Sequence, residues 1–263
     1  MRGPFRSVAA ALFAAAALAS HAQGEFLVPP ASLVLDGLPP IPAEIAAKAA
    51  PYTDFKPGTL LDWHPLRREI LVRLRLGNAD QLHRVAQPGA TPDPLTDHPD
   101  AVSAGRYEPR AGNWLLFTRG TGGDEAFRIY RLDPAMKEAR PVSPAGRRAS
   151  APEWNHKADR IVFTSVPVDR NNDSREARTT VHLADPGAPD EARELAELTG
   201  GGWFDFTFSP DDRLLAFVEY VSAEESHVWL MDVATGKRRR LTPPTRGEAV
   251  FYANPQFSPD GKG

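Results

Sequence analysis

The stretch from Trp203 to Pro243 reads WFDFTFSPDDRLLAFVEYVSAEESHVWLMDVATGKRRRLTP. It predicts four short strands: Trp203–Phe208, Leu214–Val218, Val228–Val233 and Arg238–Leu241. The turn SPDD at 209–212 separates the first two strands, because proline presets φ and aspartate caps the backbone. The TG pair at 235–236 marks a hairpin between the last two. The run 214–218 is apolar throughout, as expected of a strand buried on both faces, so one such unit needs neighbouring copies to cover it.

Copies are present along the chain, each opening on an aromatic residue followed by a polar residue and, in most cases, proline. The openings are Trp63-His64-Pro65, Tyr107-Glu108-Pro109, Trp154-Asn155-His156, Phe208-Ser209-Pro210 and Phe257-Ser258-Pro259. A β-forming run follows each of the first four: Ile70–Leu74, Leu115–Thr118, Ile161–Thr164 and Leu214–Val218. A third run follows in turn: Leu82–Val85, Phe127–Leu132, Thr180–Leu183 and Val228–Val233.

The leading aromatics are spaced between 44 residues (Trp63 to Tyr107) and 54 residues (Trp154 to Phe208). Periods of roughly 40–50 residues with four strands each are typical of propeller blades. The sequence therefore predicts an all-β fold, a β-propeller of four-stranded antiparallel blades. We expect blades at about 58–100, 101–148, 149–200 and 201–248, and the start of a fifth at 249–263, so that the propeller is incomplete.

Residues 23–57 predict a proline-rich arm with apolar side chains available for docking, although a disordered linker is the alternative. Within it, the segment from Pro42 to Ala50 predicts a short helix that ends before Pro51, since proline favours the first helical position and disrupts later ones.

Residues 1–22 predict a secretory signal peptide. Arg2 and Arg6 supply positive charge, Val8–Leu18 is apolar, and Ser20-His21-Ala22 fits a cleavage site. The alternative is a membrane anchor, but a span needs about 20 apolar residues. We expect an exported protein, periplasmic or secreted, without a membrane span after cleavage.

Composition limits the chemistry. The formal net charge of −3 argues against a nucleic-acid partner. The chain has no cysteine, which excludes disulfides, thiolate catalysis and cysteine-based zinc sites.

Two loops have residue patterns found in ligand-binding sites. The loop Asp169–Glu176 contains D-x-N-x-D, but Ser174 and Thr180 replace the glycine and glutamate of a calcium loop, so a solvated loop is favoured. The glycine-rich segment Gly120–Glu125 lacks the Lys-Ser/Thr of a phosphate loop and predicts a hairpin turn. Its Asp124 and Glu125 could bind an amine together, but adjacent strand residues point to opposite faces.

The basic run Lys237–Arg240 predicts a solvated outer strand whose charges deter pairing. The histidines lack metal-ligand spacing, and His64 and His156, which lie in the repeated turn, are interpreted as structural. No G-x-S-x-G nucleophile elbow occurs. The sequence thus nominates no catalytic, cofactor-binding or metal-binding residue and no cofactor, and it leaves substrate-binding residues unknown.

Two motifs resemble the TolB-type propeller repeat: the Phe-Ser-Pro-Asp openings at 208–211 and 257–260, and the closing segment Val228–Thr242. Other stretches resemble the N-terminal half of bacterial exported peptidases of the prolyl oligopeptidase family, in the dipeptidyl and acylaminoacyl peptidase branch. These are Gly201–Phe204, Glu219–Ser226, Gly122–Glu125 and Val28–Pro30. The resemblance covers roughly residues 26 to 263.

The resemblance implies a two-domain enzyme. In it, the propeller caps a C-terminal α/β-hydrolase domain and filters peptide substrates by size, while a Ser-Asp-His triad in the hydrolase domain cleaves short peptides. The N-terminal arm would pack against that domain. Because residues 257–263 lie within an opening turn, we expect a truncated product, poorly soluble and inactive alone. No catalytic residue of the family has a matching position here. The alternative is a TolB-like binding propeller without chemistry, and a propeller enzyme with a central metal is less favoured.

Overall fold

The computed structural model describes residues 26–136, 138–168, 178–200, 202–243 and 249–261. The chain divides into two compact units, Met1–Lys56 and Pro57–Gly263. The predicted leader at 1–22 and the loop at 169–176, which the sequence predicts to be solvated, lie outside the described residues.

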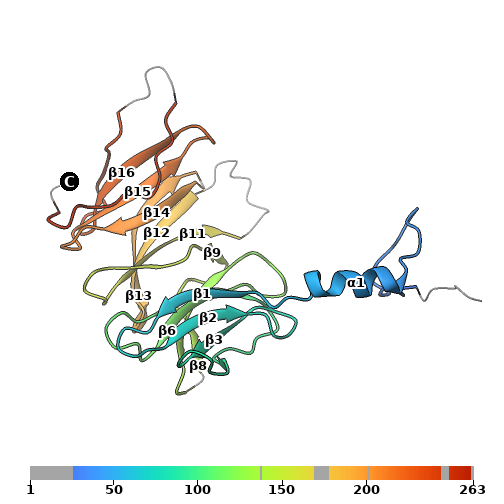
Figure 1. The fold of residues 1–263 in the computed structure, drawn as a ribbon. Helices are drawn as coiled ribbons and strands as arrows, with labels where there is room; N and C mark the ends of the chain where they lie inside the picture. The colour runs from blue at the N-terminus through green and yellow to red at the C-terminus, as the bar shows by residue number, and fades with distance from the viewer. Residues whose placement is uncertain (1–25, 137, 169–177, 201, 244–248, 262–263) are drawn as a thin grey trace, which may run out of the picture. The chain divides into compact units, whose positions relative to one another are not determined.

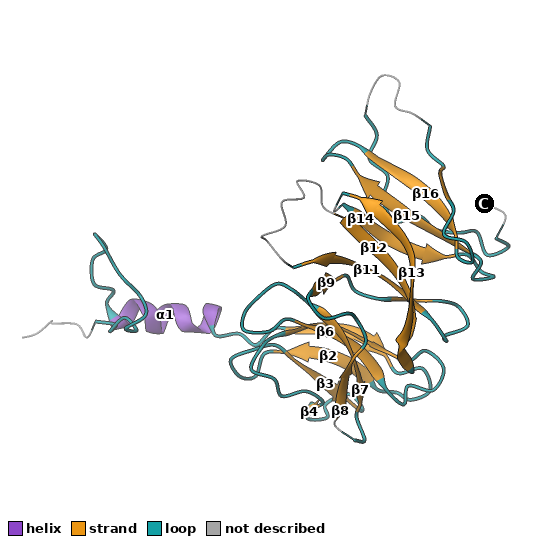
Figure 2. Cartoon of the chain, turned by 180° about the vertical axis from the view of Figure 1, so that it is seen from behind, coloured by secondary structure: helices purple, strands orange, loops and turns teal. Residues whose placement is uncertain are grey.

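In the described part of the first unit, residues 26–56 contain one helix, α1 (Ala43–Thr53), drawn in purple in Figure 2. The predicted helix end before Pro51 is wrong, because α1 continues through this proline. Proline removes only one backbone donor, and the Asp54 N–H donates to the Ala50 carbonyl (2.8 Å) to close the last turn. Among the described residues no helix is both long and apolar enough to cross a membrane.

The second unit consists of four antiparallel sheets, shown in order from cyan to orange-red in Figure 1. The first sheet is β1 (Gly58–Trp63), β2 (Ile70–Leu74), β3 (Gln81–Val85) and β4 (Asp93–Pro94). The second is β5 (Val102–Tyr107), β6 (Leu115–Arg119), β7 (Arg128–Asp133) and β8 (Glu138–Pro141). The third is β9 (Arg147–Ala149), β10 (Glu153–Trp154), β11 (Ile161–Pro167), β12 (Arg178–Asp185) and β13 (Ala188–Thr199). The fourth is β14 (Trp203–Phe208), β15 (Leu214–Tyr220), β16 (Ser226–Asp232) and β17 (Arg238–Arg240).

These sheets confirm the predicted fold: an all-β propeller of four antiparallel blades. Apart from β9, each strand pairs with a neighbour in sequence, as expected of a blade built from successive hairpins. In the third blade, β9 and β10 both pair with β11, so they are two halves of one interrupted first strand. Five strands therefore occupy four positions.

The first strand of every blade is irregular. The register shifts between Leu60 and Asp62 in β1, between Val102 and Gly105 in β5, and between Phe204 and Thr207 in β14. In the third blade the break between β9 and β10 falls in the same part of the strand. First strands also meet across blades, since β1 contacts β5 and β10 contacts β14. In a propeller these strands surround the central channel.

Apolar clusters lie between successive blades, and the second strands supply both sides. In β6, Leu115 and Phe117 pack in the cluster shared with the first blade, while Leu116 packs in the cluster shared with the third. In β11, Ile161 faces the second blade's cluster and Val162 the fourth's. This two-sided burial explains why the second strands read as continuous apolar runs.

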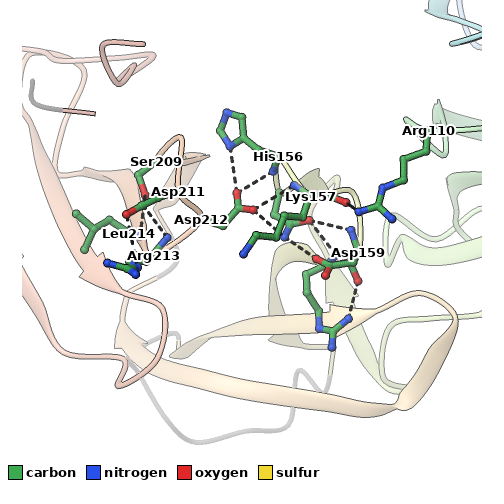
Figure 3. Close-up of polar contacts among 11 residues, drawn as sticks. Arg110, His156, Lys157, Asp159, Ser209, Asp211, Asp212, Arg213 and Leu214 are labelled. Atoms are coloured by element: carbon green, nitrogen blue, oxygen red, sulfur yellow. Dashed lines mark hydrogen bonds and ion pairs between the residues drawn. The ribbon is translucent and has the colours of Figure 1, made fainter. Parts of the chain in front are cut away.

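The fourth blade's opening turn is held by the buried hydroxyl of Ser209. Its Oγ accepts a hydrogen bond from the Leu214 N–H (2.9 Å) and donates one to the Asp211 carboxylate (2.7 Å), as Figure 3 shows. The Ser209 N–H in turn donates to the Leu214 carbonyl (2.9 Å). Ser258 repeats the hydroxyl contact with Asp260 (2.6 Å), so the opening of the next repeat forms the same turn.

In the other blades, the buried residue at the equivalent position also accepts hydrogen bonds from backbone N–H groups of the turn, but through a different acceptor group. Asn155 Oδ1 accepts from two backbone N–H groups, those of residues 159 and 160. His64 Nδ1 accepts from the N–H groups of residues 66 and 67 (3.1 Å each). The Glu108 carboxylate accepts from three, at residues 110, 111 and 112. The interpretation of His64 as a structural residue is confirmed.

Asp212 joins the turns of two blades. It has a positive φ of 61°, and its carboxylate accepts from the backbone N–H groups of His156 (2.8 Å) and Lys157 (3.1 Å). The Asn155 amide also donates to it (3.2 Å), and Figure 3 shows these contacts crossing from one blade to the next. His156 therefore serves the turn, as predicted.

Replacing Ser209 with alanine tests the turn contact. We expect S209A to lower the free energy of unfolding by about 1–3 kcal/mol, because the partly buried Leu214 N–H loses the buried Ser209 hydroxyl as its partner. The matched control is S222A, since the Ser222 Oγ also accepts from two backbone N–H groups, but in an exposed loop where water replaces it. Urea denaturation measures both variants. Equal losses would contradict the role assigned to Ser209.

Candidate functional site

The residue before each leading aromatic is polar and lies at the end of a first strand. These residues are Asp62, Arg106, Glu153 and Thr207, and we call them the axial ring. Arg106 and Glu153 are exposed, and the other two are partly exposed. Because first strands surround the channel of a propeller, the fold brings one polar side chain from each blade to this region.

Three of these residues line one cleft of about 310 Å³, which we call the axial cleft. Its lining residues are Asp62, Trp63, Pro65, Arg106, Tyr107, Pro109, Pro152, Glu153 and Trp154. Trp63 leaves 64% of its surface exposed, which is unusual for so large an aromatic side chain. The cleft therefore combines an accessible aromatic surface and rigid prolines with a few charged groups, as ligand sites commonly do.

Both carboxylate oxygens of Asp62 already accept hydrogen bonds from backbone N–H groups. One carboxylate oxygen accepts from its neighbour, the Trp63 N–H (2.8 Å), and the other accepts from the Tyr107 N–H of the next blade (2.9 Å). Tyr107 also donates its hydroxyl to the buried Glu69 carboxylate (2.9 Å). Burial and this hydrogen bond raise the pKa of Tyr107, so the phenol stays protonated. These contacts fix the wall of the axial cleft between the first two blades.

Arg106 and Glu153 are the charged side chains of the axial cleft that remain available to bind a ligand. Within the described part of the chain, no hydrogen bond or ion pair is found for either side chain. Surrounding protein raises the pKa of Glu153 by desolvation; the Arg106 charge opposes this shift and Asp205 adds to it. The cleft thus offers a guanidinium that can bind a carboxylate or carbonyl, beside a carboxyl group that accepts a proton more readily than usual.

A serine and a histidine do come together, but inside the third blade. Ser165 Oγ lies 2.7 Å from His182 Nε2, a separation typical of a nucleophile and its base. Both residues are buried, with 1% and 2% of their surfaces exposed, and Arg147 Nε donates to the same hydroxyl (2.6 Å). A substrate cannot reach this pair, so its role is to join β9, β11 and β12.

The loop candidates form turns. Gly122 and Gly123 have positive φ angles between β6 and β7, which confirms the predicted hairpin. Asp124 Oδ1 accepts from the Thr121 N–H (2.9 Å) and so caps this turn. Lys237 precedes β17, the outermost strand of the fourth blade, as the basic run predicts. Among the described residues, no group of three or more metal-ligating side chains is found.

The axial cleft was not identified from the sequence. Its signal was the polar residue that precedes every leading aromatic, a position with no fixed residue type. Only the fold shows that these positions meet, because each lies on a different blade.

No family model matches this sequence, and no curated protein matches it. Solved structures do resemble the fold. TolB from Acinetobacter baumannii is 22% identical with a TM-score of 0.50, over 79% of this chain and 47% of that one. A structure from a study of two prolyl endopeptidases is 16% identical with a TM-score of 0.55, over 67% and 28%.

Prolyl oligopeptidase B from Galerina marginata, bound to a 25mer macrocyclization substrate, is 12% identical with a TM-score of 0.56, over 75% of this chain and 32% of that one. The chain therefore spans less than half the length of each of these three structures. At these identities the likeness shows a shared propeller fold.

The buried His182 predicts a pH dependence of stability. Burial, assisted by the nearby Arg147 charge, lowers its pKa from 6.5 to about 4. The unfolded chain therefore binds the proton first as the pH falls, and stability is lost from about pH 6.5 down to about pH 4. We expect wild type to lose about 2 kcal/mol more than H182Q between pH 7 and pH 5, measured by urea denaturation. Parallel pH profiles would contradict this assignment.

Proposed function

We propose that this chain is the substrate-gating propeller portion of an exported peptidase of the prolyl oligopeptidase family, acting on short peptides. The proposal assigns catalysis to an α/β-hydrolase domain of the intact protein, outside these 263 residues. In this proposal the propeller's partners are that hydrolase domain and the peptide. The propeller admits peptides and carries no chemistry itself.

The axial cleft is the observation that supports this proposal most. An extended peptide has apolar side chains that can rest on Trp63 and on the cleft prolines, and carbonyl or carboxylate oxygens that can accept from Arg106. Glu153, whose pKa is raised, can either accept from a peptide N–H or, when protonated, donate to a carbonyl. The shared fold with two prolyl-peptidase structures is consistent with such a role.

Export is part of the proposal and depends on the leader sequence. Arg2, Arg6 and the apolar run Val8–Leu18 support cleavage after Ala22.

A TolB-like binding propeller is the second candidate, favoured by the structural similarity to the Acinetobacter baumannii protein. Such a scaffold would hold a folded protein on its surface. The two candidates differ in whether a short peptide occupies the axial cleft.

A peptide titration distinguishes them. We expect the capped octapeptide AAPEAPAA to change the fluorescence of the full chain, and the change to disappear in W63F, because Trp63 lies exposed in the cleft. R106A should weaken binding roughly tenfold or more, the effect of losing one charge-assisted hydrogen bond of about 1.5–3 kcal/mol.

R75A is the matched control, since Arg75 is an exposed arginine that follows β2 at the end of the strand away from the opening turn. It should bind the peptide as wild type does. Absence of a Trp63-dependent signal, or equal effects of R106A and R75A, would refute the gating role and leave the binding scaffold as the better account.

A further inference from the structure

The outer edge of the fourth blade carries an unusual charge pattern. The outermost strand β17 (Arg238–Arg240) follows Lys237 directly, so four cations stand in a row in a chain whose net charge is −3. β17 bonds to β16 on one side, and no further strand pairs with it among the described residues. Lys237, Arg238 and Arg239 are exposed, and Arg240 is partly exposed.

In each of the other blades, an arginine in the outer strand or in the strand beside it pairs with a carboxylate of the outer strand. In the first blade Arg84 pairs with Asp93 of β4 (2.6 Å). In the second, Arg140 of β8 pairs with Glu138 (3.1 Å). In the third, Glu197 of β13 pairs with Arg178. Within the described residues, none of the four cations at 237–240 has a carboxylate within 4.0 Å. Among the described residues, the outer strand of the fourth blade therefore lacks the arginine–carboxylate pair found in each of the other three blades.

The register shows which backbone groups face outward. The Asp232 N–H donates to the Lys237 carbonyl (2.9 Å), and the Leu241 N–H donates to the Val228 carbonyl (2.8 Å). Bonded and non-bonded pairs alternate along an antiparallel ladder, so Arg239, opposite Leu230, also bonds inward. The N–H and C=O groups of Arg238 and Arg240 therefore point away from the sheet. Their side chains share one face, and the Arg239 side chain occupies the other.

The hairpin that presents this edge is fixed in place. The Arg193 guanidinium of the third blade donates to the Ala234 carbonyl (2.9 Å) and to the Val233 carbonyl. Gly236 has a φ of 69°, and a Cβ there would lie 2.2 Å from the Leu195 carbonyl oxygen. The turn thus packs directly on β13, and a partner would meet a preorganised edge.

We propose that the β17 edge is a docking site for an extended acidic segment of a partner protein. The segment adds to the sheet as a further strand, bonding the outward backbone groups of Arg238 and Arg240. Acidic side chains at alternate positions of that strand pair with the two guanidinium groups. The cationic row repels basic strands, and a neutral strand would desolvate its charges without compensating them. The charges that deter unspecific pairing therefore also select the partner. This site is separate from the axial cleft and does not depend on the proposed function.

A fluorescein-labelled peptide TEVEVET tests the site by fluorescence anisotropy on the full chain. We expect binding that weakens with added salt. R238E/R240E should lower affinity roughly tenfold or more, because two attractive contacts become repulsive. R239E is the matched control with a smaller effect, since its side chain lies on the other face. Thermal melting of each variant establishes that it folds.

Amide hydrogen exchange on the wild-type chain gives a second readout that needs no variant. The peptide should slow exchange at Arg238 and Arg240 and leave Arg239, whose amide already bonds inside the sheet, unchanged. Absence of binding, equal binding of the same-composition peptide EEVTVTE, or equal losses in R239E and R238E/R240E would overturn the proposal. Binding to vesicles of anionic phospholipid without binding to the peptide would overturn it as well.

Discussion

One buried polar residue in each opening turn holds the blades in register. Ser209, Asn155, Glu108 and His64 each accept backbone N–H groups of the tight turn that joins the first strand to the second. Buried N–H groups without partners cost about 1–3 kcal/mol each, so the turn needs such an acceptor. The acceptor is a hydroxyl, an amide, a carboxylate or an imidazole nitrogen. The feature common to the four turns is therefore a buried hydrogen-bond acceptor that reaches the backbone N–H groups of the turn, whatever its chemical type.

The same turns place the charged groups of the axial cleft. Each turn starts where a first strand ends, so the residue before the aromatic lies at the same position in every blade. The irregular register of β1, β5 and β14, and the break between β9 and β10, release these strands from strict pairing just before that point. Arg106 and Glu153 thus reach the channel side without a partner among the described residues. The charged groups of the axial cleft thus occupy a position that recurs in every blade but carries a different residue type in each blade.

Much of the fold could be predicted because its determinants are local. The aromatic openings and the apolar second strands identified the blades. The SPDD segment at 209–212 and the TG pair at 235–236 identified turns that the structure contains. The prediction that the helix ends before Pro51 was wrong. The proline removes a single hydrogen bond, and the bond from the Asp54 N–H to the Ala50 carbonyl still closes the last turn. The first-strand irregularities and the axial cleft could not be predicted, since both depend on contacts between blades more than 40 residues apart in sequence, such as Asp62 with Tyr107.

Amide hydrogen exchange at the four opening turns tests this account most directly. The amides to follow are those of Arg67, Gly112, Arg160 and Leu214, each of which donates to the buried acceptor of its own turn. We predict similar, strong protection at all four sites despite the four different acceptors. Fast exchange at Arg67 or Arg160, with protection kept at Leu214, would show that the histidine and asparagine turns do not perform the function of the serine turn, and would contradict the account.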